Sequence, residues 1–224
     1  MRKIWVSCLL TTFLFSVGNV ATAAEKWDMA LIGRMNIPKH VYIEPGAQMA
    51  LPFVETNSPN ITLARMGIPD GHFYSITWSD GANFTYGWAA SAVIGAQYLQ
   101  KEGVTGYRNL SLSEQLDVIA ETVNKYIIAQ RAVFDGETPL VKISDKKHPR
   151  WEGSFTIQKE VQGILYRTKY FVTVQQNEIR IAIGIFSADA DTPEMTKALS
   201  EMLQKRKFLK EIEWQKLLSS EITE

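Results

Sequence analysis

Three consecutive β-strand patterns between residues 151 and 186 constrain the fold more than any other feature of the chain. Apolar and polar side chains alternate from Trp151 to Gln158, and similar alternation runs through the 166–174 and 179–185 segments. A period of two places each kind of side chain on its own face of a sheet. The breaks at 161–163 and 175–178 are short enough to be hairpin turns. These residues therefore predict an antiparallel meander whose apolar face must be covered by another layer.

A helix that could cover this face follows directly. Thr192-Pro193-Glu194 supplies an N-cap residue, a proline at the first helical position and an acid in the first turn. Four apolar side chains then form a stripe at helical spacing: Met195, Leu199, Met202 and Leu203. The 209–224 tail alternates apolar and charged residues, and we expect a frayed or peripheral C-terminal helix there.

Two further helices are expected before the meander. Ser111 and Glu114 match the S-x-x-E capping box, and apolar residues recur at spacings of four and three after them. This pattern predicts a helix from Ser111 to about Phe134. A stripe of small and apolar residues also suggests a helix over 85–101, ended by Gly103 and Gly106.

The N-terminal part contains mainly short strand candidates. Five of the eight prolines lie between residues 24 and 70, so only short strands fit between them. The candidates are 41–43, 48–53 and 61–66. A better strand runs from His72 to Trp78, because its residues favour β-structure, and Ser79-Asp80-Gly81 then predicts a turn.

The fold class expected from these elements is α+β, with an antiparallel sheet covered by helices. We expect a single domain over residues 24–208, because no linker-like composition divides this stretch.

The N-terminus has the three parts of a secretory signal peptide. Arg2 and Lys3 precede an apolar run from Ile4 to Phe15, and Ala21-Thr22-Ala23 matches the small-residue cleavage pattern. The run is shorter than the roughly 20 apolar residues that span a bilayer. We therefore expect residues 1–23 to be removed and the protein to be periplasmic or extracellular, with an uncleaved N-terminal anchor as the alternative.

Composition then excludes several classes of function. Cys8 lies in the apolar run, so the mature chain would have no cysteine, thiolate metal site or thiol redox chemistry. Without Arg2 and Lys3, 22 basic residues face 24 acidic ones, a net charge of −2. No basic stretch is dense enough to suggest a nucleic-acid partner. We expect no membrane-spanning segment after signal cleavage.

The stretch from Trp151 to Phe208 resembles the PsbP-like family. The resemblance lies in the order of Tyr166-Arg167-Thr168-Lys169-Tyr170-Phe171, a turn, the 179–186 strand and the helix opened by Thr192-Pro193-Glu194. It implies an α/β/α sandwich and an accessory, assembly or binding role. The two adjacent helices expected before the meander depart from the family pattern. No functional residue of the family has a match in this chain.

Enzyme and metal motifs are poorly represented in the sequence. There is no G-x-S-x-G. His72 with Ser75 or Ser79 and Asp80 could be drawn as a triad, but residues on one local strand rarely converge in that way. Asp70, His72 and Asp80, or the D-x-D of Asp189 and Asp191, lack the ligand pattern of a zinc site. We expect no metal and no cofactor, and the catalytic residues of any enzyme are unknown.

The richest candidate for a binding site is the 72–88 segment, in which aromatic rings, glycines and a few polar groups alternate. Such a composition suits a sugar, a peptide or a small apolar ligand. The candidate ligand-binding residues are His72, Trp78, Asp80, Tyr86 and Trp88. The alternative is that these rings belong to the core and anchor the strand.

The leading hypothesis is a non-enzymatic, extracytoplasmic protein that binds a protein partner or a small ligand, as an envelope accessory or assembly factor. The alternative is a hydrolase acting on envelope material, with a polar site near His72. A third possibility is a homo-oligomer formed through the charged C-terminal helix. The sequence indicates neither the partner nor the oligomeric state.

Overall fold

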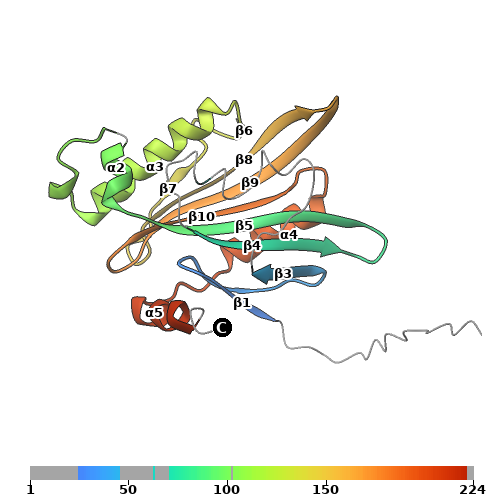
Figure 1. Ribbon diagram of the computed structural model, residues 1–224, viewed down its shortest axis with the longest axis horizontal. Helices are drawn as coiled ribbons and strands as arrows, with labels where there is room; N and C mark the ends of the chain where they lie inside the picture. Colours follow the sequence, from blue (N-terminus) through green and yellow to red (C-terminus); the bar gives the residue numbers. More distant parts are fainter. Residues whose placement is uncertain (1–24, 46–62, 64–70, 102, 221–224) are drawn as a thin grey trace, which may run out of the picture.

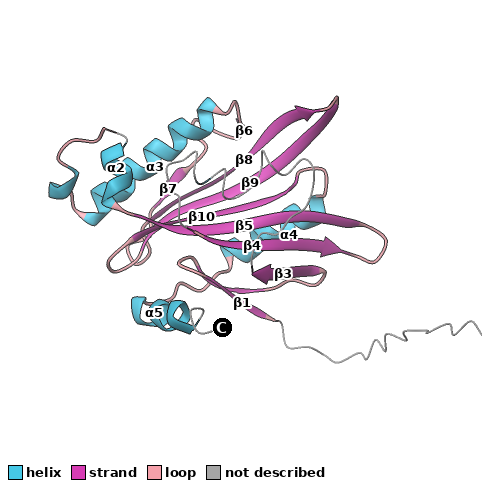
Figure 2. Cartoon of the chain, viewed as in Figure 1, coloured by secondary structure: helices cyan, strands magenta, loops and turns pink. Residues whose placement is uncertain are grey.

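A computed structural model describes residues 25–45, 63, 71–101 and 103–220 (Figures 1 and 2). The strands are β1 (Lys26–Met29), β2 (Gly33–Asn36), β3 (Val41–Pro45), β4 (His72–Ser79), β5 (Phe84–Ile94), β6 (Val133–Phe134), β7 (Val141–Ile143), β8 (Arg150–Val161), β9 (Ile164–Gln176) and β10 (Ile181–Asp189). The helices are α2 (Ala96–Lys101), a 3₁₀ turn (Tyr107–Asn109), α3 (Leu112–Ala129), α4 (Pro193–Gln204) and α5 (Glu211–Ser220).

The central sheet has eight strands, and every pair in it is antiparallel. Its order is β3-β4-β5-β10-β9-β8-β6, with β7 also paired to β8, while β1 and β2 form a separate hairpin. The last strand in sequence, β10, therefore lies at the centre of the sheet. There it pairs with both β5 and β9, and so joins the N-terminal strands to the C-terminal meander.

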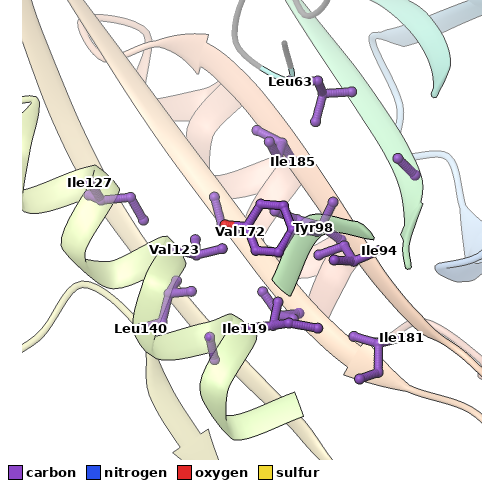
Figure 3. Close-up of a cluster of buried hydrophobic side chains, with 14 of the residues drawn as sticks. Leu63, Ile94, Tyr98, Ile119, Val123, Ile127, Leu140, Val172, Ile181 and Ile185 are labelled. Carbon is purple, nitrogen blue, oxygen red and sulfur yellow. The ribbon is translucent and has the colours of Figure 1, made fainter. Parts of the chain in front are cut away.

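One face of the sheet is covered by α3, with α2 packed beside it. Leu116, Ile119, Val123 and Ile127 lie along the buried stripe of α3. They meet inward-facing residues of β9 and β10 such as Val172 in a cluster of buried side chains, shown in Figure 3. The apolar residues of α3 thus recur at the spacing with which this helix contacts the sheet.

The other face is covered by α4 and the β1–β2 hairpin. The apolar stripe of α4 packs with the hairpin and with Phe186 of β10 in a second buried cluster. The Gln175 side-chain amide also donates hydrogen bonds to the backbone oxygens of Leu31 and Ile32, at 3.1 and 2.9 Å. These bonds fix the hairpin turn against the sheet. Helices therefore lie on both faces of an antiparallel sheet, and the α+β class is confirmed.

The predicted meander is confirmed as β8, β9 and β10. The β8–β9 turn consists of Gln162 and Gly163, which have φ angles of 53° and 78°. A two-residue loop with both φ values positive is the turn that best matches the twist of a hairpin. The strand predicted at 72–78 is β4, and the short strand predicted at 41–43 is β3.

The helix predicted over 85–101 is wrong for most of its length. Residues 84–94 form β5, and only Ala96–Lys101 are helical. Between Gly87 and Ala92 both faces of β5 are buried, one beneath α3 and the other beneath α4 and the β1–β2 hairpin. A strand buried on both sides shows no alternation of polar and apolar residues, so its small and apolar residues also fit a helical stripe.

Several boundaries also differ from expectation. The capping box of Ser111 and Glu114 is confirmed, but α3 ends at Ala129, two residues before Arg131 adopts a φ of 56°. Pro193 opens α4 as predicted, although the Thr192 hydroxyl donates to Asp189 and does not cap the helix.

The C-terminal tail forms α5, whose Trp214 is fully buried. The predicted signal peptide and the strand candidates at 48–53 and 61–66, apart from Leu63, lie outside the described residues.

Candidate functional site

The candidate residues of the 72–88 segment do not form one site. His72 begins β4 and Asp80 follows its last residue. Eight residue rises along a strand separate their backbones by about 26 Å. His72 and Asp80 therefore cannot share a catalytic or metal-binding centre, and a triad with Ser79 is wrong on geometry. Asp70 lies outside the described residues.

The two candidate tryptophans are core residues on opposite faces of the sheet. Trp78 is buried in the cluster beneath the β1–β2 hairpin and α4. Trp88 is buried in the cluster beneath α3, where its ring meets that of Tyr170 edge-on at 5.9 Å. Burial in the core also raises the pKa of the Tyr170 hydroxyl. Neither tryptophan offers a surface to a ligand.

Asp80 organises the turn between β4 and β5. Its carboxylate accepts hydrogen bonds from the backbone N–H groups of Ala82 and Asn83, at 2.9 and 2.7 Å, and from the Asn83 side-chain amide. The Asn83 backbone contact, followed by the other two, lowers the pKa of Asp80. An acid used in this way closes a turn, and its oxygens are engaged locally.

The D-x-D pair is also structural. Asp189 accepts from the backbone N–H of Asp191 and from the Thr192 hydroxyl, while Asp191 pairs with Arg167 at 2.6 Å. Among the residues that the structure describes, no three His, Cys, Asp or Glu side chains are arranged to hold a metal ion.

Tyr86 is the aromatic candidate that remains at the surface, and it belongs to an exposed aromatic group. Tyr86 is 42% exposed, and its ring meets that of Phe84, a residue that is 54% exposed, edge-on at 4.3 Å. Tyr42 on β3 is 60% exposed. Tyr42 lies opposite Thr77 of β4, and Thr77 lies opposite Tyr86 of β5. Since directly paired residues share a face, the three rings project from one side of the sheet.

The β8–β9 hairpin carries a second apolar projection at the same end of the sheet. The final rung between β9 and β10 joins Thr168 to Asp189, so the hairpin continues about 13 Å further as two strands alone. Figure 1 shows this hairpin extending past its neighbours. Ile164 and Leu165, beside the turn, are 56% and 57% exposed. We call Tyr42, Phe84 and Tyr86 together with Val161–Leu165 the aromatic end.

Sequence reasoning missed Tyr42, Ile164 and Leu165, and the reason for Tyr42 differs from that for the other two. Tyr42 lies in a proline-rich stretch whose sequence does not indicate which strand it pairs with. The face of the sheet on which Tyr42 lies could therefore not be assigned. Ile164 and Leu165 were visible as apolar residues directly after a predicted turn. Apolar side chains at a hairpin tip do not cover a sheet face. Their presence beside a predicted turn could therefore have marked them as a candidate binding surface.

The opposite end of the sheet holds a polar network around Arg206. Its guanidinium donates to Glu152 at 2.6 Å, to the Gln175 side-chain oxygen at 3.1 Å and to the Leu203 backbone oxygen at 2.7 Å. Desolvation lowers the pKa of Arg206, and Glu152 opposes this shift. The Nε of Arg150 lies 3.3 Å from the same Glu152 oxygen, without hydrogen-bond alignment. Sequence reasoning had assigned none of these residues a role.

No helix within the described part of the chain is both long and apolar enough to cross a membrane. Comparisons with protein-family models, with curated proteins and with solved structures find no match for this chain. Its function is therefore inferred from the residues and contacts described above.

Proposed function

We propose that the protein is a non-enzymatic, exported binding protein that holds a protein partner at its aromatic end. The observation that carries this proposal is the exposed group formed by Phe84, Tyr86 and Tyr42, with two apolar residues at the neighbouring hairpin tip. Aromatic side chains supply large contact areas with little loss of conformational entropy, and they are enriched in protein interfaces. Large exposed apolar groups of this kind mark interaction sites.

A protein partner is favoured over a small ligand by the spread of these side chains. Five strand spacings of about 4.8 Å separate β3 from β8, so the aromatic end is roughly 24 Å wide. This width matches a standard interface of about 800 Å² on each partner. A small ligand is held by groups that converge on one cavity, whereas the side chains of the aromatic end project from separate strands.

The setting is proposed on sequence grounds. The signal-like N-terminus favours a periplasmic or extracellular location. The PsbP-like resemblance over 151–208 favours an accessory or assembly role, and the presence of helices on both faces of the sheet is compatible with it. The envelope-acting hydrolase is the less favoured alternative, because His72 and Asp80 lie at opposite ends of β4.

Site-specific photo-crosslinking in the exporting cell tests the proposal. A benzophenone amino acid in place of Phe84 should form an adduct whose added mass corresponds to one protein. The matched control carries the same group in place of Ile212, which is equally accessible but lies on α5. We expect a discrete protein adduct from position 84 and none of that mass from position 212.

Two results would overturn this assignment. The same protein adduct from both positions would show non-specific proximity, and no adduct from position 84 would show that the aromatic end has no protein partner. An adduct of small mass would replace the protein partner with a small ligand.

A further inference from the structure

Two short segments contain a third of all basic residues of the chain. The 142–150 and 205–210 segments together carry eight of the 24 Lys and Arg residues but only one of the 24 acidic residues, Asp145. The whole chain has a formal net charge of zero, whereas these fifteen residues have a formal charge of +7. Neither segment is long enough to stand out as a basic run on its own.

The fold brings the two segments together around the ring of Phe208. The His148 ring stacks on Phe208 with centroids 4.2 Å apart and an interplanar angle of 7°. The guanidinium carbons of Arg206 and Arg150 lie 4.5 and 5.3 Å from the centroid of the same ring. These contacts place the 142–150 loop against the connection between α4 and α5. We call the two segments together the basic end.

The two arginines of the basic end and four of its six lysines are used differently, whereas Lys142 and Lys205 pair with Asp117 and Glu201. Arg206 and Arg150 point inward, where Glu152 and Asp145 neutralise them. Lys146, Lys147, Lys207 and Lys210 are exposed, and no ion pair to an acid of the described chain engages them. Four uncompensated lysine charges therefore face the solvent.

The carboxylates near these lysines are already engaged. Glu201 pairs with Lys205 at 2.8 Å, and the buried Glu211 pairs with Arg180. Glu213 accepts a hydrogen bond from the backbone N–H of Lys210 at 2.9 Å. None of these acids therefore forms an ion pair with the four exposed lysines.

We propose that the basic end docks on an anionic phospholipid surface. Lysine presents a compact, hydrated charge on a flexible stem, which suits a diffuse layer of phosphate headgroups. Arginine, whose planar fork reads individual phosphates or carboxylates bidentately, is turned inward here and serves the fold. Each lysine near such a surface contributes about 1 kcal/mol, which is about fivefold in membrane partitioning.

This contact goes beyond the proposed partner binding and uses the other end of the molecule. β8 starts at the basic end with Arg150 and finishes at the aromatic end with Val161. Eleven rises along a strand separate the two by about 36 Å. A protein held to lipid by the basic end would therefore leave the aromatic end free for a partner.

Vesicle flotation of the protein purified from the exporting cell tests the proposal. The probes are vesicles of phosphatidylcholine alone and vesicles with 30% phosphatidylglycerol, at about 0.1 M salt. We expect binding to the anionic vesicles only, with release at about 0.5 M salt because the charges are screened. The variant K146Q/K147Q/K207Q/K210Q should lose binding by about two to three orders of magnitude.

A matched variant, K26Q/K39Q/K125Q/K197Q, removes the same charge from exposed lysines elsewhere and should bind like the wild type. Wild type and both variants are purified in the same way, so the N-terminal apolar run is in the same state in each and cannot cause a difference between them. Equal binding to both vesicle types, or equal losses in the two variants, would overturn the proposal. Lysine-dependent binding to a polyglutamate peptide without vesicle binding would do so as well, and would assign the basic end to an acidic protein.

Discussion

Glu152→Gln should destabilise the protein strongly, although Glu152 is not in an apolar core. Its carboxylate is the charged partner of Arg206, whose side chain is only 2% exposed. Removing one partner of a buried pair leaves an uncompensated charge and costs about 3–5 kcal/mol. Because the Glu152 side chain retains 22% exposure, we expect the lower end, about 3 kcal/mol. For a chain of this size the melting temperature would fall by about 6–12 °C.

The assay is urea denaturation of a double-mutant cycle with Glu152→Gln, Arg206→Met and the double variant. The double variant should be more stable than the sum of the two single losses predicts, by about 2 kcal/mol, because it leaves no unpaired charge. Glu160→Gln, on an exposed position of the same strand, is the matched control and should change stability by less than about 0.5 kcal/mol.

The reasoning would be refuted by a Glu152→Gln variant as stable as the Glu160→Gln control. Strict additivity in the cycle would also refute it, because the two side chains would then not act as a pair. In either case the Arg206 network would not anchor the 205–210 segment to the sheet.

Three further predictions concern the core and the turn. Gly153→Ala should lower the free energy of unfolding by at least about 2 kcal/mol in denaturant titration, because the new Cβ would lie 1.8 Å from the Pro139 backbone oxygen. Unchanged stability would show that the loop around Pro139 can move away from the new methyl group without cost. Trp88→Ala should lower the free energy of unfolding by about 3–5 kcal/mol, and Tyr86→Ala should lower it by about 1 kcal/mol or less. Similar losses in the two variants would contradict the different burial of the two side chains. Asp80 has a lowered folded pKa, so its stabilisation should be present above about pH 4 and lost as the pH falls through that folded pKa. The stability difference between wild type and Asp80→Asn should therefore shrink with acidification, and a constant difference would contradict this.

The C-terminal half could be predicted from sequence because its patterns are local. Alternation, the short break predicted at 161–163 and the Pro193 helix start each depend on neighbouring residues. The capping box of Ser111 and Glu114 was likewise visible, and both of its hydrogen bonds form.

The central strand could not be predicted, because its identity depends on distant pairing. β5 is a strand because β4 and β10 lie on either side of it, and β10 lies far away in the sequence. The wrong helix prediction also affected the candidate binding site. A helix starting at residue 85 would have placed Tyr86 and Trp88 together at an accessible junction between the loop and the helix. In a strand the same two residues differ because Trp88 is covered by the core beneath α3, whereas Tyr86 lies near the exposed end.

The basic end was invisible for a similar reason. Each segment is short, and a chain with balanced charge shows no excess of basic residues. The packing of His148 and Arg150 on the Phe208 ring brings the two segments together. Charge clusters of this kind depend on tertiary contacts, whereas net charge and local runs are properties of the sequence.

Hydroxyl-radical footprinting of the protein in the cell that produces it, compared with the purified chain, tests whether a partner covers the aromatic end. We predict that oxidation of Phe84 and Tyr86 is several-fold lower in the cell than in the purified chain, while Ile212 is oxidised equally in both samples. Trp88 should react slowly in both, because it is buried. Equal oxidation of Phe84 and Tyr86 in the two samples would contradict the claim that a partner covers the aromatic end.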